Sequence, residues 1–352
     1  HYPFEGMYTI AHALKDLDYR RFNLGHMHWR TDKVDNGYEP WVSPGINMDE
    51  LSDKAKRYIK WEYEDITRRQ TGGPSPRKKN EYWGHQVARE SIKLIKKATK
   101  NNENFLNWTA FTEPHPPFYP PKEIYEKIDQ NKLELPVEVP EGYPEPYSAI
   151  VSKQEEWNHL TNEEKRQIKA GYYGMVTLAD NYIGRILETI EELNLWDDTI
   201  IIFTSDHGEQ LGDHNLFTKF VMREPSVHVP LFVYHPDLKH GIRKQLVEHV
   251  DIFPTICDYT GADVPDDLHG SSLKPILEND KTPSDWRKAV FSQIGDVYMI
   301  RTAKWKLNVY DGEPGELYNL EEDPKEFNNV IDDEQYNQVK IELQAQLKKI
   351  IK

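Results

Sequence analysis

Cysteine is almost missing from this sequence, because Cys257 is the one thiol among 352 residues. A single cysteine cannot form an internal disulfide, and it cannot build a thiolate metal site by itself. No stretch approaches the roughly 20 uninterrupted apolar residues that a membrane span requires, so we expect a soluble chain without a membrane anchor. The sequence starts at His1 with no initiator Met, which leaves the compartment open.

Basic residues are in deficit, with 44 Lys and Arg against 59 Asp and Glu and a formal net charge of −15. A surface this negative repels polyphosphate backbones unless a local basic patch overrides it, so we expect no nucleic-acid partner. The hydrophobic share of 38% over this length suffices for one large α/β domain with a small appendage.

Helices and strands alternate along most of the chain. Apolar residues recur every three or four positions from Thr161 to Leu195, which predicts a long amphipathic helix with Thr161 and Glu164 as its capping box. Other helices are expected over 9–17 and 92–99, and strands over 22–24, 105–112, 199–204 and 229–234. This order predicts an α/β fold with a doubly wound, mostly parallel sheet flanked by helices.

The pattern changes from about Trp286 onward. Short strand-like runs at 289–292, 297–302 and 305–310 precede a charged helix from Glu334 to Ile351. We therefore predict an α/β domain over residues 1–285 and a small C-terminal antiparallel α+β subdomain with a terminal helix over residues 286–352.

Three predicted strands end in segments rich in histidine, at 25–29, 113–118 and 205–214. Ligands bind at the carboxyl ends of strands in open α/β sheets, so we expect these segments to share one edge. Asp206 and His207 suit a divalent metal, since Gly208 lets the chain bend there. Lys219 can return a cation to the same pocket, which favours a tetrahedral anionic substrate. The alternative is a capped turn with an ordinary solvated lysine.

Three other histidines are candidates for the same pocket. His115 is held between prolines, where it can protonate a leaving oxygen or bind an anion, although a purely structural role is the alternative. His26 and His28 are two positions apart and point to opposite sides of an extended strand, so at most one need face the pocket. We favour His28.

Five ordered segments carry a family likeness. Residues 203–214 with Lys219 resemble the metal and lysine segment of sulfatases and phosphonate monoester hydrolases in the alkaline phosphatase superfamily. Residues 25–28 are similar to that family's Gly-Lys-Trp-His stretch, and residues 113–118 to its Pro-His-Pro-Pro-Phe loop. The other two segments are 250–256 with 269–273, and the Glu-Leu-Tyr-Asn-Leu-Glu-Glu-Asp-Pro run at 316–324.

The resemblance implies a role for each candidate. Asp206 and His207 would bind a divalent metal, calcium or alternatively manganese, and His207 in place of the more common Asn favours the phosphonate hydrolases. Lys219 and His115 would contact sulfate or phosphate oxygens, and His28 would position the nucleophile. The implied substrate is a small-molecule or carbohydrate sulfate ester, and the oligomeric state stays open.

Two departures from the family pattern affect the expected activity. His26 replaces the lysine of Gly-Lys-Trp-His, and the Cys/Ser-x-Pro-x-Arg motif that yields formylglycine is absent from the chain. We expect that motif upstream, which would make this chain inert alone and the full-length protein a sulfuric ester hydrolase. The alternatives are phosphonate monoester or phosphodiester hydrolysis, or a catalytically inactive binding protein.

Overall fold

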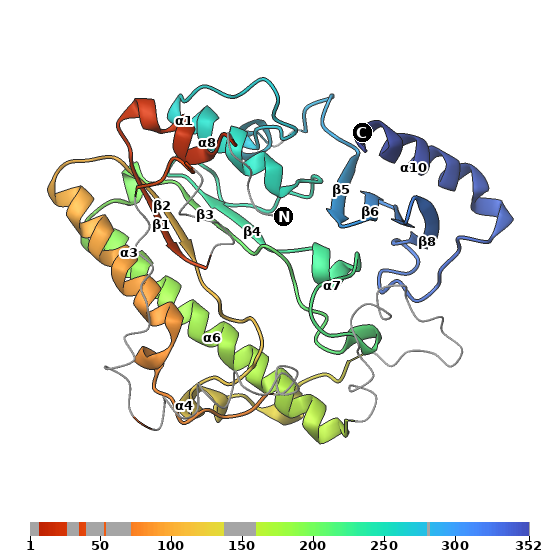
Figure 1. Cartoon of the computed structure of the whole chain (residues 1–352), viewed down its shortest axis with the longest axis horizontal. Coiled ribbons are helices and arrows are strands. Elements are labelled where there is room, and N and C mark those ends of the chain that lie inside the picture. The colour runs from red at the N-terminus through yellow and green to blue at the C-terminus, as the bar shows by residue number, and fades with distance from the viewer. Residues whose placement is uncertain are drawn as a thin grey trace. The chain divides into compact units, whose positions relative to one another are not determined.

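The computed structural model describes residues 7–26, 35–39, 53, 72–136, 160–279 and 282–351 (Figure 1). These residues form two compact units, and each is described by itself. Unit 1 comprises the described residues within His1–Leu135, Thr161–Thr199 and Ile256–Asp267, and unit 2 comprises those within Pro136–Leu160, Ile200–Thr255 and Leu268–Lys352.

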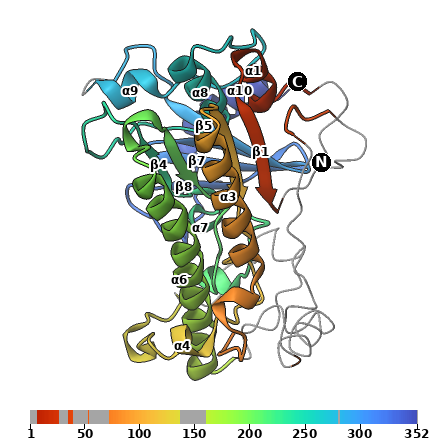
Figure 2. The same cartoon turned by 90° about the vertical axis from the view of Figure 1, so that its left-hand side faces the viewer.

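Unit 1 is built around a parallel pair of strands. Its main elements are α1 (Ile10–Ala13), β1 (Arg20–Gly25), α3 (Trp83–Lys100), β2 (Phe105–Ala110), α4 (Lys122–Tyr125) and α6 (Asn162–Glu192). β1 pairs in parallel with β2 from Arg20 opposite Phe105 to Gly25 opposite Ala110. Helix α3 packs on both strands and lies beside α6 (Figure 1, Figure 2). The predicted order of helix and strand is confirmed here.

The long helix α6 begins where the sequence predicts. The Thr161 hydroxyl accepts from the Glu164 N–H, and the Glu164 carboxylate accepts from the Thr161 N–H at 2.8 Å, which completes the capping box. Its buried side packs with α3 and α4 in a core of Tyr82, Ala88, Ile124, Met175, Leu178 and Tyr182. The 3.6-residue period of the sequence therefore marks the face that is buried.

Unit 2 contains an antiparallel strand pair and a second sheet. Its elements are β3 (Ile201–Thr204), α7 (Glu224–Val227), β4 (Leu231–Tyr234), α9 (Lys274–Glu278), β5 (Ala289–Ile294), β6 (Val297–Thr302), β7 (Trp305–Tyr310), β8 (Glu313–Asn319) and α10 (Asn337–Ile350). β3 pairs with β4 in the antiparallel sense. Helix α8 (Ile252–Thr260) belongs partly to each unit and buries Cys257, as the sequence suggested.

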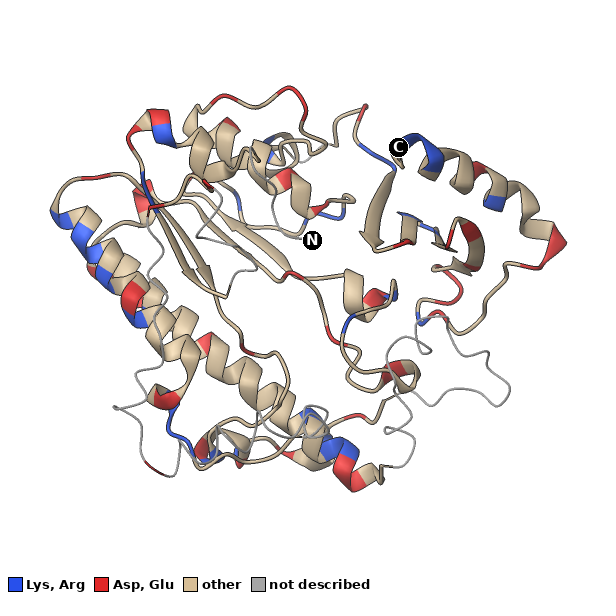
Figure 3. Ribbon diagram, in the orientation of Figure 1, with Lys and Arg blue, Asp and Glu red and all other residues tan. Residues whose placement is uncertain are grey.

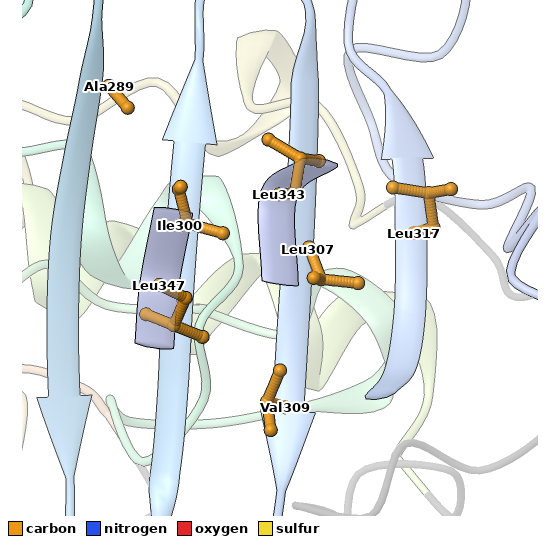
Figure 4. Packing of buried hydrophobic residues seen from close by; sticks show 7 residues of the cluster. All are labelled: Ala289, Ile300, Leu307, Val309, Leu317, Leu343 and Leu347. Atoms are coloured by element: carbon orange, nitrogen blue, oxygen red, sulfur yellow. The ribbon is translucent and has the colours of Figure 1, made fainter. Parts of the chain in front are cut away.

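The C-terminal sheet has the order β5-β6-β7-β8, and all its pairs are antiparallel. One face carries Ile300, Leu307 and Leu317, on which Leu343 and Leu347 of α10 pack (Figure 4). Successive strand residues point to opposite faces, so Lys306 lies on the face away from α10. The antiparallel subdomain with a terminal helix is confirmed, and the boundary at residue 285 stays a prediction.

Charge is spread unevenly over the chain. Helix α3 carries Arg89, Lys93, Lys96, Lys97 and Lys100 against the single acid Glu90 (Figure 3). Within the described residues, no helix combines the length and apolar character needed to cross a membrane.

Candidate functional site

The site loop, defined as residues 205–219, leaves the end of β3 and turns back on itself. The Gln210 N–H donates to the Thr218 carbonyl at 3.0 Å, and the Gly212 N–H donates to the Leu216 carbonyl at 2.8 Å. These bonds turn the chain back, so the residues before Lys219 lie beside residues 210–212. The loop therefore brings Asp206, His207 and Lys219 into one region of unit 2.

Asp206 and His207 present two donor atoms side by side. Nδ1 of His207 lies 2.8 Å from the Gly208 carbonyl, which can only accept, so Nδ1 carries the proton and Nε2 carries the lone pair. That Nε2 is 3.5 Å from Oδ2 of Asp206. Two ligands of one divalent cation lie about 3 Å apart when each bond is about 2.1–2.4 Å long. The pair fits two positions of a metal shell, with His207 oriented by a backbone carbonyl.

The described residues do not supply a complete metal shell. Among them, no group of three or more His, Cys, Asp and Glu side chains is placed to hold a metal ion. Asp206 is also open to solvent, since its side chain is 82% exposed. Asp206 and His207 are therefore suited to be two ligands of a metal ion whose remaining ligands are not among the described His, Cys, Asp and Glu side chains.

Glu209 holds the two arms of the site loop together, a role that the sequence did not reveal. Its Oε1 accepts from the Thr218 N–H at 2.5 Å and from the Leu211 N–H at 3.1 Å. Burial raises the pKa of Glu209, and these N–H donors and the Lys219 charge oppose the shift. The carboxyl group therefore fixes the residue immediately before Lys219.

Lys219 lies half-buried at the end of this loop. Burial lowers the pKa of its ammonium group, and the carboxylates of Asp206 and Glu209 oppose that shift. A cation in this position can balance negative charge on a ligand next to Asp206, because its attraction is screened less than at an open surface.

His115 follows β2 in unit 1 and stands on a tightly packed loop. The peptide bonds Glu113-Pro114 and Pro116-Pro117 are cis, and Phe118 is fully buried. His115 itself is exposed, and its Nδ1 lies 2.8 Å from the Pro116 carbonyl, so Nε2 is the nitrogen that can meet a ligand. His115 therefore stands on a proline-rich loop as predicted from the sequence, and its role stays a prediction.

Glu113 anchors the loop that carries His115. The sequence did not reveal this role, although Glu113 lies in the segment 113–118. Its carboxyl group is buried, and Oε1 accepts from the Gly84 N–H at 3.2 Å in the first turn of α3. Helix α3 has no side-chain cap from its own N-cap residue Tyr82. Burial raises the pKa of Glu113, against the opposing effect of this N–H and of Arg77. A carboxyl group is favoured at a helix N-terminus, so Glu113 joins the loop to α3.

His26 follows β1, the strand beside β2, and is exposed. Its N–H donates to the Ala110 carbonyl at 3.1 Å, which extends the pairing past the end of β1. Gly25 has φ of +93°, and a Cβ there would lie 1.8 Å from the Ala110 oxygen, so a glycine is required. His28 lies outside the described residues, and its predicted role stays a prediction.

The predicted residues thus fall into two groups. His26 and His115 belong to unit 1, whereas Asp206, His207 and Lys219 belong to unit 2. The structure brings Asp206, His207 and Lys219 into one region, and it places His26 and His115 after the paired strands β1 and β2. The pocket shared by both groups stays a prediction.

Unit 1 also contains a cavity of about 1090 Å³ that includes none of the predicted site residues. Its walls carry charges that satisfy one another. Lys79 pairs with Glu123 at 3.7 Å, and Lys122 pairs with Glu126 at 3.4 Å. A guanidinium nitrogen of Arg185 lies 3.1 Å from Nδ1 of His85. The cavity therefore has mixed charge, unlike the predicted anion pocket.

Comparison with known proteins identifies the family. The family model for sulfatases matches residues 3–262, and the model for the C-terminal region of N-sulphoglucosamine sulphohydrolase matches residues 212–352. The chain belongs to the sulfatase family. An arylsulfatase of Clostridium perfringens is 31% identical over an alignment of 286 residues, and the match covers 73% of this chain and 56% of that sulfatase.

Other relatives agree with this assignment. An N-acetylglucosamine-6-O-sulfatase of Bacteroides thetaiotaomicron is 34% identical over 59% of this chain and 41% of its own. The solved phosphonate monoester hydrolase of Silicibacter pomeroyi superposes with a TM-score of 0.74 at 21% identity, covering 97% of this chain and 78% of that one. That likeness shows that the chain has the fold of this hydrolase. The chain spans about half the length of the curated sulfatases it matches.

Proposed function

We propose that the full-length protein is a metal-dependent sulfatase that hydrolyses a small-molecule or carbohydrate sulfate monoester. The observation that carries this proposal is the site loop, which holds two metal-ligand donors 3.5 Å apart and returns Lys219 beside them. Membership of the sulfatase family supports the reaction type, and the names of the arylsulfatase and N-acetylglucosamine-6-O-sulfatase relatives support the substrate class.

Each residue has a role in the proposed reaction. Asp206 and His207 are two ligands of a divalent cation, calcium or alternatively manganese, which would supply Lewis-acid stabilisation of the sulfate oxygens. Lys219 contacts a nonbridging oxygen and balances its charge. His115 gives a proton from Nε2 to the leaving alcohol oxygen. His26 contacts the anion, and His28 positions the nucleophile. A formylglycine, as the family resemblance implies, would supply the attacking oxygen.

Metal binding tests the first part of the proposal. Asp206→Asn should weaken Mn²⁺ or Ca²⁺ affinity of the full-length protein at least about 10-fold in calorimetry, because even second-shell losses cost that much. Asp237→Asn is the matched control, since Asp237 is 91% exposed and lies 3.9 Å from His235, much as Asp206 lies beside His207. Equal affinities of the two variants would contradict the assignment.

A second candidate is hydrolysis of phosphonate monoesters or phosphodiesters. His207 and the fold shared with the phosphonate monoester hydrolase favour it. Turnover of 4-nitrophenyl sulfate and phenyl phenylphosphonate by one preparation, before and after chelation of metals, separates the two reactions. Faster turnover of the phosphonate ester would favour the second candidate, and no turnover of either with metal present would favour an inactive binding protein.

A further inference from the structure

The site loop is packed against helix α7. The Gly208 N–H donates to the Ser226 carbonyl at 2.8 Å, and the Gln210 side-chain amide donates to the Ser226 hydroxyl at 2.8 Å. A Cβ on Gly208 would lie 1.9 Å from the Pro225 carbonyl oxygen, so the two backbones are in direct contact. The position of α7 therefore sets the position of the residues next to His207.

Helix α7 is held in turn by an ion cluster, defined as Arg223, Glu224, Arg301, Lys306 and Glu326. The Lys306 ammonium group lies 2.5 Å from Glu224, 2.7 Å from Glu326 and 3.1 Å from the Met222 carbonyl. The Glu224 N–H donates to the other oxygen of Glu326 at 2.8 Å. Both ends of Glu224 are thus bound, and Lys306 on β7 is the central cation.

The segment after β8 completes the contact. Arg223 donates to the Glu326 carbonyl at 2.6 Å and to the Tyr318 hydroxyl at 3.1 Å. On the next residue, the Phe327 ring stacks on the ring of His214 with their centres 4.3 Å apart. The C-terminal sheet therefore contacts the site loop through α7, and the segment that follows β8 contacts it directly at His214.

The burial of this cluster suggests why it is charged. The Lys306 side chain is fully buried, and Glu326 is 1% exposed. Well-packed apolar residues often stabilise a core as much as a buried ion pair does, whereas ions and their hydrogen bonds fix relative positions. We therefore infer that this charged cluster fixes the position of α7 rather than adding stability.

We propose that Lys306, Glu224 and Glu326 are positioning residues for the site loop, so that the C-terminal sheet takes part in the reaction by holding Asp206, His207 and Lys219 in place. The catalytic part of this inference rests on the proposed sulfatase function. The structural part can be tested without it.

The test uses the double variant Lys306→Met with Glu326→Gln in the full-length protein. Glu224 keeps its contacts with Arg301 at 3.0 Å and with His228 at 3.3 Å, so no buried carboxylate is left without a partner. The amide oxygen that replaces the Glu326 carboxylate can still accept from the Glu224 N–H. The variant thus removes the central cation and its bond to the Met222 carbonyl without leaving a buried carboxylate unpaired. Tyr318→Phe, which removes only the hydroxyl that Arg223 contacts, is a milder second variant.

The control is Leu343→Ala, which weakens the opposite face of the same sheet. We expect amide hydrogen exchange across residues 206–219 to rise about 10-fold or more in the double variant, while α10 changes less than about 2-fold. Leu343→Ala should give the reverse pattern. The proposal is overturned if the site loop exchanges at the same rate in the double variant and the wild type. It is also overturned if Leu343→Ala raises exchange of the site loop as much as the double variant does.

Turnover of 4-nitrophenyl sulfate provides the functional readout. Displacement of the loop by about 1 Å should lower kcat about 10- to 100-fold with a smaller change in KM. Unchanged kcat in an active protein overturns the catalytic part. If the wild type turns over neither ester, the proposed function fails, and hydrogen exchange alone then decides whether Lys306 positions the loop.

Discussion

Replacement of Gly208 by alanine is a sharp test of the site loop. The added Cβ would lie 1.9 Å from the Pro225 oxygen, and ordinary contact begins at 3.4 Å, so the two backbones must part by about 1.5 Å. Pro225 lies in α7, which the Lys306 ion cluster holds, so the residue that moves should be Gly208. His207 would move with it.

The cost can be worked out from the contacts that are lost. Separation breaks the bond from the Gly208 N–H to the Ser226 carbonyl, worth about 1 kcal/mol, and overpacking adds about 1–3 kcal/mol. We expect Gly208→Ala to lower the free energy of unfolding by about 2–4 kcal/mol. Displacement of His207, the proposed metal ligand, by more than about 1 Å should also lower kcat/KM for an aryl sulfate by about 100-fold.

Urea unfolding and steady-state kinetics of the full-length protein measure both effects. Gly184→Ala is the matched control, because Gly184 lies inside α6 and no heavy atom beyond the adjoining backbone of that helix lies within 4 Å of the added Cβ. The control should gain about 0.5–1 kcal/mol from helix propensity. If Gly208→Ala raised the free energy of unfolding as much as Gly184→Ala and left turnover unchanged, the close contact between the site loop and α7 would be refuted.

Three further predictions concern single groups. Lys219→Met should lower kcat/KM for an aryl sulfate by about 100- to 1000-fold at unchanged urea midpoint, with the exposed Lys239→Met as control in the same assays. Glu113→Ala should cost about 1–2 kcal/mol in urea unfolding at neutral pH, because the cap on Gly84 is lost while an unfavourable buried charge is also removed. Burial and the charges of Arg185 and Arg89 lower the pKa of His85. The neutral imidazole should therefore stabilise the fold above pH 6.5, and this stabilisation should be lost as the pH falls through the folded-state pKa. His85→Gln should reduce that pH dependence of the urea midpoint, and an unchanged dependence would contradict the assignment.

The elements were predictable wherever the signal is local. The capping box at Thr161 and Glu164, the apolar period of α6 and the short strands after residue 286 depend on residues close in sequence. The antiparallel pairing of β3 with β4 depends on the path of the 26 residues between them, and periodicity holds no information about that path.

The positions of the candidate residues after strand ends were predictable, since Asp206 and His207 follow β3 and His115 follows β2. Their assembly into one site stays a prediction. The supporting carboxyl groups were not predictable. Glu113 and Glu209 act through backbone N–H groups that are brought near them only by folding. Lys306 occupies a strand position that would ordinarily face solvent, and its burial depends on Glu224 and Glu326, which are distant in the sequence.

The fully buried side chain of Lys306 has a consequence for recombining sulfatases. Consider a chimaera that takes β5 to β8 and α10 from a relative. It would keep Glu224 of this chain but replace Lys306 by the residue of the relative. Such a hybrid should express poorly unless residues 222–226 are transplanted with the sheet. Fragments for grafting are therefore better defined by shared salt bridges than by the ends of secondary structure.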